Sequence, residues 1–275
     1  MKLAVLALCL TSASAFVAPA AQRAGGVSLG AEEGEAAAAA PAPVAAAAAV
    51  DLEAMAAELN PVVKFWDPLG LAEKDFWSQG NAATVGFLRQ AEIKHGRVAM
   101  FGFVGYLVHA QGVTWPFKMS LDGSDWPALG GDSVIALWDK LPTASKWQII
   151  LFCGLLEFND EWQYRGPAAD APATAKPKHY MSGGKPGDYP DFSGIPWSPL
   201  PLYDPLGLSK KRSEESKAKS RLAEINNGRL AMLGLFGFLS ESVLPGSVPA
   251  LTKVGLPHYD GNVMIPFEGD FSIFS

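Results

Sequence analysis

Two short stretches of the chain carry side chains that could pair charges and bind a cation. Each has a glutamate, then a nitrogen or oxygen donor three residues later and an arginine five residues later: Glu92, His95 and Arg97, and again Glu224, Asn227 and Arg229. Side chains five residues apart on a helix do not face each other, because helical neighbours lie three or four residues apart. Each charge therefore needs a partner outside its own stretch. We expect two reciprocal ion pairs, Glu92 with Arg229 and Glu224 with Arg97.

The neutralised glutamates and the donors beside them predict axial ligands to the magnesium of a chlorophyll. A carboxylate whose charge is cancelled by an arginine keeps a free oxygen, and oxygen donors suit a hard cation. His95 and Asn227 lie on the same helix face as the glutamates three residues before them. The four ring nitrogens of a chlorophyll leave an axial position open to such donors. The simpler alternative for His95 is a hydrogen-bonded histidine at a helix contact.

Four further polar side chains are weaker candidates for the same role. His109 and Glu241 each lie 14 residues beyond the donors just named. Fourteen helical residues rise about 21 Å, so both are expected near the opposite side of a membrane. Glu241 has the alternative of simply marking a helix end. Gln148 and Glu157 are the polar groups of an otherwise apolar run, and ordinary interfacial positions are an equal alternative for them.

The charged stretches belong to an internal repeat. Residues 92–105 align without gaps with residues 224–237, at a constant offset of 132 residues (92 to 224). Each copy follows a similar tag, Trp66–Leu71 in the first case and Tyr203–Leu208 in the second. So many identities in order indicate two versions of one structural unit.

The repeat and a third apolar run predict an all-α membrane protein. Start signals, apolar runs and breakers place helices at about 84–111, 143–162 and 212–243. No charge follows Arg97 through Ala110, or Arg229 until Glu241, so these halves lack the polar outer face of a soluble helix. No run reaches the roughly 18 apolar residues of a typical span, which keeps a soluble three-helix protein as the alternative. We expect three transmembrane helices, the first and third a pseudo-two-fold crossed pair.

A stripe of small residues runs along both copies of the repeat. Glycine or alanine recurs at every third position from Gly96 to Gly105 and from Gly228 to Gly237. Glycine inside a helix costs up to about 1 kcal/mol relative to alanine, so the stripe needs a reason. Close helix packing is one reason, and a flat macrocycle lying against the helix is another. The long connections, 113–141 and 164–202, are rich in Gly, Pro and Trp, and we expect loops there.

The N-terminus indicates targeting sequence. Lys2, an apolar run and Ala13-Ser14-Ala15 predict a signal peptide over residues 1–15. Residues 16–50 are poor in acids at first and then rich in Ala and Pro, which predicts a transit peptide and linker. Residues 51–275 remain as the functional domain. The net charge of −6, and the lack of a basic block interleaved with aromatic residues, argue against a nucleic-acid partner.

The repeated motifs, Glu-Ile-Lys-His-Gly-Arg-Val-Ala-Met and Glu-Ile-Asn-Asn-Gly-Arg-Leu-Ala-Met, resemble the first and third helices of the chlorophyll-binding light-harvesting family of plastid membranes. The resemblance runs from about Trp66 to Ser242. Within that family the chain is more similar to the chlorophyll a/c antennae of dinoflagellates, diatoms and their relatives than to the green-plant a/b type. The first motif, the run Gln148-Ile149-Ile150 and the leader carry this distinction.

The resemblance implies a set of pigments and their sites. The implied cofactors are chlorophyll a, chlorophyll c and carotenoids such as peridinin, fucoxanthin or a related xanthophyll. The implied axial ligands are Glu92, His95, Glu224 and Asn227, with Arg97 and Arg229 as counter-ions. Carotenoid end groups are implied near Asp67–Gly70 and Asp204–Gly207. The family often has glutamine where this chain has Glu241.

The resemblance also implies a cellular setting. The protein is expected to be nuclear-encoded and carried by bipartite targeting to the thylakoid membrane of a red-lineage secondary plastid. The N-termini of the first and third helices face the stroma in the family. The implied partners are the core of photosystem I or II, neighbouring antenna subunits and thylakoid lipids.

Light harvesting without catalysis is the implied function, and three alternatives remain. A photoprotective member of the family would quench excitation instead of passing it on. A structural or stress-related membrane protein would share the helices without pigment. The spacing Glu92-x-x-His95 also occurs in di-iron carboxylate bundles, although the second copy has Asn227 where a histidine is required.

Overall fold

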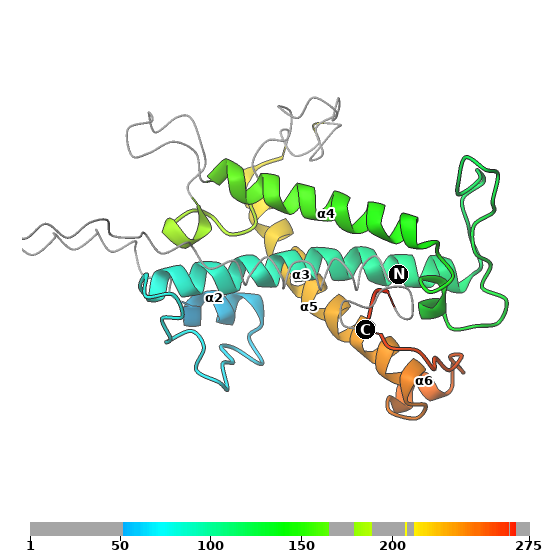
Figure 1. The fold of residues 1–275 in the computed structure, drawn as a ribbon. Helices are drawn as coiled ribbons and strands as arrows, with labels where there is room; N and C mark the ends of the chain where they lie inside the picture. Colours follow the sequence, from blue (N-terminus) through cyan, green and yellow to red (C-terminus); the bar gives the residue numbers. More distant parts are fainter. Residues whose placement is uncertain (1–51, 165–178, 189–206, 208–211, 264, 268–275) are drawn as a thin grey trace, which may run out of the picture.

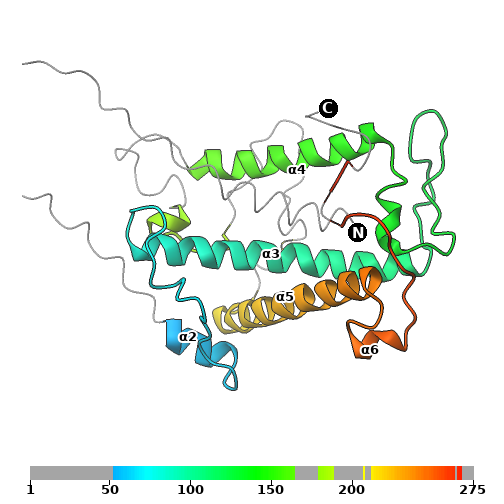
Figure 2. The ribbon, with the colours of Figure 1, turned by 60° about the horizontal axis from the view of Figure 1, so that its bottom comes forward.

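Three long helices organise the molecule. The computed structural model describes residues 52–164, 179–188, 207, 212–263 and 265–267, and within these ranges the regular elements are all helical. The long helices are α3 (Asn81–Ala110), α4 (Thr143–Tyr164) and α5 (Glu214–Val243). Figures 1 and 2 show α3 and α5 crossing while they run in the same direction, with α4 alongside α3 and antiparallel to it.

Four short elements lie between and beside the long helices. They are α2 (Leu52–Leu59), the 3-10 turns η1 (Val134–Leu137) and η2 (Tyr180–Ser182), and α6 (Pro249–Thr252). The sequence predicted none of them, because one or two helical turns are too short to show a hydrophobic period. The connections 113–141 and 164–202, expected to be loops, therefore contain η1 and η2 in their described parts.

The ends of α3 and α5 follow from local chemistry. The side chain of Ser213 accepts a hydrogen bond from the amide of Ser216 at 3.3 Å, which caps the start of α5. Helix α3 begins after Gly80, at φ 93°, three residues before the expected start. Its end is followed by Gly112 at φ 68°, a conformation that glycine adopts without a steric penalty.

The crossing of α3 and α5 is centred on two equivalent glycines. A Cβ atom on Gly228 would lie 2.9 Å from the Cα of Gly96, and a Cβ on Gly96 would lie 3.1 Å from the Cα of Gly228. The two positions are related by the 132-residue offset of the repeat (96 to 228). Because protein interiors leave carbon atoms little room to approach more closely, the backbones can meet here only where side chains are absent.

A second pair of equivalent residues meets further along the crossing. The rings of Tyr106 and Phe238 stack with centroids 4.4 Å apart and planes 6° apart. Tyr106 is buried, and it shares one apolar core with Ala99 and Ala231, which are themselves equivalent in the repeat. Contacts between equivalent positions are the arrangement expected of a crossed pair with pseudo-two-fold symmetry.

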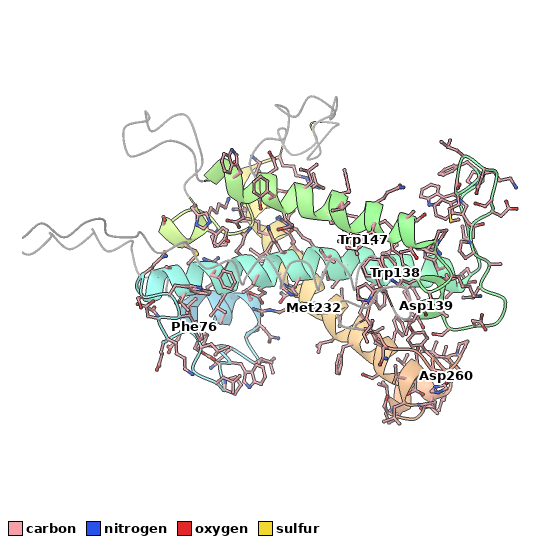
Figure 3. All side chains as sticks on the ribbon, in the orientation of Figure 1. Phe76, Trp138, Asp139, Trp147, Met232 and Asp260 are labelled. Carbon is pink, nitrogen blue, oxygen red and sulfur yellow. The ribbon has the colours of Figure 1, made fainter. Side chains whose placement is uncertain are left out.

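Residues 265–267, near the C-terminus, pack against the start of α4 and the turn before it. The indole Nε1 of Trp138 donates a hydrogen bond to the carbonyl oxygen of Pro266 at 2.8 Å. The rings of Trp147 and Phe267 stack with centroids 4.7 Å apart. Figure 3 labels both tryptophans, which lie at the end of the molecule where α3 ends and α4 begins. This end is therefore fixed by residues more than one hundred positions later in the chain.

The outer faces of the long helices are rich in exposed apolar side chains. Examples are Phe101 on α3, Leu151 and Phe158 on α4, and Leu230 and Phe236 on α5. By length and hydropathy together, no helix within the described ranges meets the criterion for a membrane span.

Candidate functional site

Two ion pairs join α3 to α5 beside the glycine contact. The Nε of Arg97 lies 2.5 Å from Oε1 of Glu224, and the Nε of Arg229 lies 2.6 Å from Oε1 of Glu92. Both pairs are the reciprocal ones predicted from the spacing of the repeat. In each pair the arginine binds one oxygen of the carboxylate and balances its charge. The second carboxylate oxygen is not needed for that bond.

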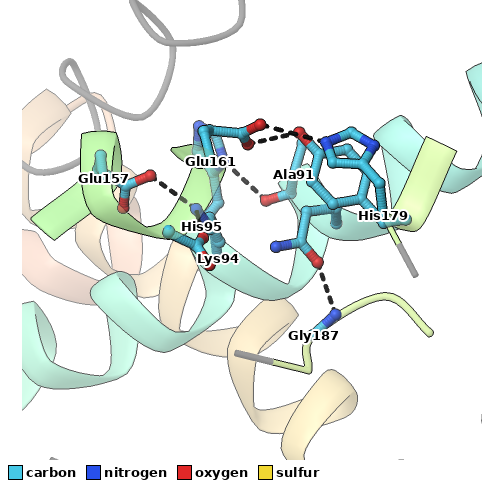
Figure 4. Close-up of polar contacts among 10 residues, drawn as sticks. Ala91, Lys94, His95, Glu157, Glu161, His179 and Gly187 are labelled. Atoms are coloured by element: carbon cyan, nitrogen blue, oxygen red, sulfur yellow. Dashed lines mark hydrogen bonds and ion pairs between the residues drawn. The ribbon is translucent and has the colours of Figure 1, made fainter. Parts of the chain in front are cut away.

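His95 is held in one tautomer by its own helix. Its Nδ1 lies 2.8 Å from the carbonyl oxygen of Ala91, one turn earlier, as Figure 4 shows. A carbonyl oxygen can only accept a hydrogen bond, so Nδ1 carries the proton and the lone pair of the neutral ring is on Nε2. A ring fixed in this way presents Nε2 as a metal ligand. The side chain is half-buried, and its counterpart Asn227 is exposed on α5.

These side chains fit the magnesium of a chlorophyll. The metal needs one neutral or charge-balanced oxygen or nitrogen donor above the ring plane, and hard oxygen donors suit it. Glu92 and Glu224 supply balanced carboxylates, and His95 supplies a directed nitrogen. A di-iron centre would instead need the two glutamates to face one metal site, whereas each faces an arginine of the other helix.

A buried charge cluster joins α3 to α4, and the sequence did not predict it. The Nζ of Lys94 lies 2.6 Å from Oε2 of Glu157 and 2.8 Å from Oδ2 of Asp160. Lys94 and Asp160 are 7% and 1% exposed. Each buried charge is therefore stabilised by the opposite charge of the other residue. Glu157, a predicted pigment ligand, is thus a partner of Lys94, although one of its oxygens is not used in that bond. Gln148, the other candidate on α4, is exposed.

A bridging segment, residues 179–188, connects the same end of α4 to α3. Glu161 accepts hydrogen bonds from the hydroxyl of Tyr180 at 2.8 Å and from Nε2 of His179 at 3.2 Å. His179 Nδ1 accepts from the amide of Met181, so Nε2 is the protonated nitrogen of the neutral ring. Burial, with the nearby Glu161 second, holds the pKa of Tyr180 well above its ordinary value. Tyr180 therefore remains a donor at any physiological pH.

Glu241, a predicted pigment ligand, has a structural role. Glu241 is 4% exposed, and it accepts hydrogen bonds from the amides of Gly246 (3.0 Å) and Val248 (2.8 Å) and from the hydroxyl of Thr252 (3.2 Å). Its carboxylate therefore closes the turn from α5 to α6, with both oxygens serving as acceptors inside the protein. Its expected role as a pigment ligand stays a prediction.

The first Asp-Pro-Leu-Gly tag is a capped turn. Oδ1 of Asp67 accepts from the amide of Leu71 at 3.0 Å, and Oδ2 accepts from the amide of Ala72 at 2.8 Å. The amides of Ala72 and Leu71, in that order, lower the pKa of Asp67 because they stabilise the carboxylate. A carotenoid end group can still lie against this turn, but not through a free carboxylate. Asp204, in the second tag, lies outside the described residues, and His109 is half-buried on α3.

The chain is similar to known proteins over most of its length. The family model described as chlorophyll A-B binding protein matches residues 51–243. A chloroplastic fucoxanthin-chlorophyll a-c binding protein of Trieres chinensis is 30% identical over 258 residues, which are 92% of this chain and 100% of that protein. Fucoxanthin-chlorophyll a-c binding protein F of Phaeodactylum tricornutum is 30% identical over 89% of this chain and 96% of its own length. With both crossed, charge-paired helices inside the matched range, the chain belongs to the chlorophyll A-B binding protein family.

Proposed function

We propose that this protein is a light-harvesting antenna that crosses the thylakoid membrane with α3, α4 and α5. The observation that carries the proposal is the pair of reciprocal ion pairs, Arg97 with Glu224 and Arg229 with Glu92. Four charges placed along two apolar helices are tolerable in lipid only if each is neutralised. The apolar side chains exposed on all three helices support the same environment.

The proposed cofactors are chlorophyll a, chlorophyll c and fucoxanthin or a related xanthophyll, as the names of the relatives suggest. Bound chlorophyll absorbs light and passes excitation to its neighbours. The chain itself contributes position: Glu92 and Glu224 offer their second carboxylate oxygen, and His95 offers Nε2. Asn227 is the fourth proposed ligand. Because the ion pairs lock the helix crossing, the donors stay at fixed separations and no catalytic step is required of the protein.

The proposed setting is the plastid. The relatives are named as chloroplastic proteins, and residues 1–50 have the composition of a bipartite leader. The proposed partners are a photosystem core and neighbouring antenna subunits. The exposed apolar faces would contact lipid, pigment or these subunits.

The test is refolding of the full chain with chlorophyll a, chlorophyll c and fucoxanthin. Each ion pair is removed whole, as Glu92→Ala with Arg229→Ala and as Glu224→Ala with Arg97→Ala, so that neither member of the pair is left without the other. Each double variant should bind less chlorophyll per chain than the wild type. The matched control is Glu215→Ala with Lys219→Ala, a 3.0 Å pair on the same helix α5 with side chains 80% and 76% exposed, which should keep its pigment.

Three outcomes would contradict the proposal. A wild-type chain that forms no coloured complex would indicate a pigment-free membrane protein. Unchanged chlorophyll content in both double variants would show that the ion pairs are not part of the pigment sites. A complex whose chlorophyll fluorescence lifetime is short from the outset, and shortens further at acidic pH, would indicate a quencher instead of an antenna.

A further inference from the structure

The two halves of the crossed pair are not equivalent around their arginines. The Nη1 of Arg97 donates a hydrogen bond to the carbonyl oxygen of Gly187 at 2.9 Å, in addition to the bond from its Nε to Glu224. Gly187 belongs to the bridging segment, residues 179–188. The side chain of Arg97 is 28% exposed, whereas that of its repeat equivalent Arg229 is 41% exposed. The bridging segment therefore covers one arginine of the pair.

Gln90 holds the bridging segment in this place. Its Oε1 accepts a hydrogen bond from the amide of Gly187 at 2.6 Å, which Figure 4 shows as a dashed line. Gln90 is only 3% exposed, so this bond is formed away from water. One residue, Gly187, thus connects the two side chains: its amide is bound by Gln90 and its carbonyl by Arg97.

The surface of α3 that contacts the bridging segment has no equivalent at the matching positions of α5. Gly86 lies one turn before Gln90, and a Cβ there would lie closer to the carbonyl oxygen of Tyr180 than any real Cβ contact allows. At Gly187, with φ +83°, a Cβ would lie 3.0 Å from Ile93. The positions equivalent to Gly86 and Gln90 in the second copy, 132 residues later, are Ala218 and Leu222. Leucine has no polar atom with which to bind a backbone amide.

We propose that Gln90 is a positioning residue for the pigment site at Glu224, which makes this site distinct from the one at Glu92. Through Gly187 it fixes the guanidinium of Arg97, and Arg97 in turn fixes the carboxylate of Glu224. The orientation of an axial carboxylate determines how the magnesium ring sits against α5. The inference rests on the proposed function, because Glu224 has an orientation to preserve only if it binds pigment.

The test is Gln90→Leu, which gives α3 the residue that its own repeat equivalent carries. The full chain is refolded with chlorophyll a, chlorophyll c and fucoxanthin, and absorption and circular dichroism are recorded at low temperature. Two reference difference spectra are recorded, in which the spectrum of each double ion-pair variant is subtracted from that of the wild type. They locate the absorption bands of the Glu224 site and of the Glu92 site. The Gln90→Leu difference spectrum should show a shifted or weakened band at the Glu224 position, with the Glu92 bands unchanged.

Gln90→Met is the matched control. Methionine keeps the unbranched length of the side chain in this buried place and removes the oxygen that accepts from the Gly187 amide, without adding a charge. This variant should give the same altered spectrum as Gln90→Leu. If Gln90→Leu does not assemble, Gly187→Ala takes its place, because its Cβ would push against Ile93 from a backbone conformation that disfavours alanine.

The outcomes separate this inference from the proposed function. A Gln90→Leu spectrum identical to the wild type, or a change at the Glu92 bands, overturns the positioning role while the antenna function stands. The same holds if Gln90→Met keeps the wild-type spectrum, since the acceptor oxygen would then be irrelevant. If neither double ion-pair variant alters the pigment, the proposed function fails and the role of Gln90 fails with it.

Discussion

Gly228→Ala should weaken the crossing of α3 and α5 because its new methyl group would meet backbone atoms. The Cβ would lie 2.9 Å from the Cα of Gly96, against an optimal carbon contact of about 3.5–4.0 Å. The helices would have to separate by about 0.6–1.1 Å to relieve this contact, taking these two distances together. No flexible side chain is present to absorb the movement, since both contacting groups are glycine backbone.

The expected effect on stability follows from two opposing terms. Overpacking of this kind destabilises by about 1–3 kcal/mol, while alanine is the better helix former by about 1 kcal/mol. The net loss is therefore up to about 2 kcal/mol. For a chain of this size each kcal/mol corresponds to about 2–4 °C in melting temperature, so Gly228→Ala should melt up to about 8 °C below the wild type.

The assay is thermal melting of the refolded full chain in detergent, followed by far-ultraviolet circular dichroism. Gly96→Ala should show a smaller decrease, because its Cβ would lie 3.1 Å from the Cα of Gly228. Gly154→Ala on α4 is the matched control, since its Cβ would meet no atom of the described residues within 4 Å. It should melt at or slightly above the wild-type temperature. The reasoning is refuted if Gly228→Ala melts no lower than Gly154→Ala.

Three further predictions concern the polar groups outside the crossing. Lys94→Met leaves Glu157 and Asp160 without their cation, and loss of one partner from a buried pair destabilises by about 3–5 kcal/mol, measurable as a lower denaturation midpoint in the same detergent. The pKa of Asp67 is lowered on folding. The stability that its carboxylate contributes to the folded state is therefore fully present above the ordinary pKa of 3.8 and is lost as the pH falls through the lower, folded pKa. The protection factor for amide exchange at Leu71 should therefore stay constant from neutral pH down to the folded pKa and fall below it, and Asp67→Ala, which has no acceptor oxygen, should show the low protection factor throughout. Glu241→Ala should accelerate amide exchange at the turn between α5 and α6, because the carboxylate accepts hydrogen bonds from this turn, and the chlorophyll content of the same variant tests the predicted role of Glu241 as a ligand.

The ion pairs were predictable because the repeat offers a matching partner for each charge. Glu92 cannot reach Arg97 on its own helix, and the arginine equivalent to Arg97 in the second copy is Arg229. Two copies of one unit then determine the pairing by symmetry. The C-terminal ends of α3 and α5 were also predictable, since Gly112 and Pro245 end helical sequence by backbone geometry alone.

The contacts of α4 were not predictable from spacing. Lys94 and Glu157 are 63 positions apart, and α4 has no repeat equivalent to indicate which face it presents. Glu157 was interpreted as a candidate ligand because it is a polar group in an otherwise apolar run, and that run does not indicate which cation faces it. The adjacent acids Asp160 and Glu161 were the available signal, since three acids in five residues near a helix end require cations or donors. The bridging segment supplies two of those donors, His179 and Tyr180, from beyond the end of α4.

The glycine contact and the ion pairs depend on each other, which explains part of the small-residue stripe. Arg229 follows Gly228 directly, so a separation of the helices at this point also moves apart the backbones that carry its 2.6 Å bond to Glu92. Unless the two side chains move to compensate, a separation of about 1 Å would take that bond beyond hydrogen-bond distance. Close packing thus accounts for Gly96 and Gly228, whereas a Cβ on Gly105 would meet no atom of the described residues within 4 Å. A flat ring lying against the helix, the other reason given for the stripe, stays a prediction at Gly105.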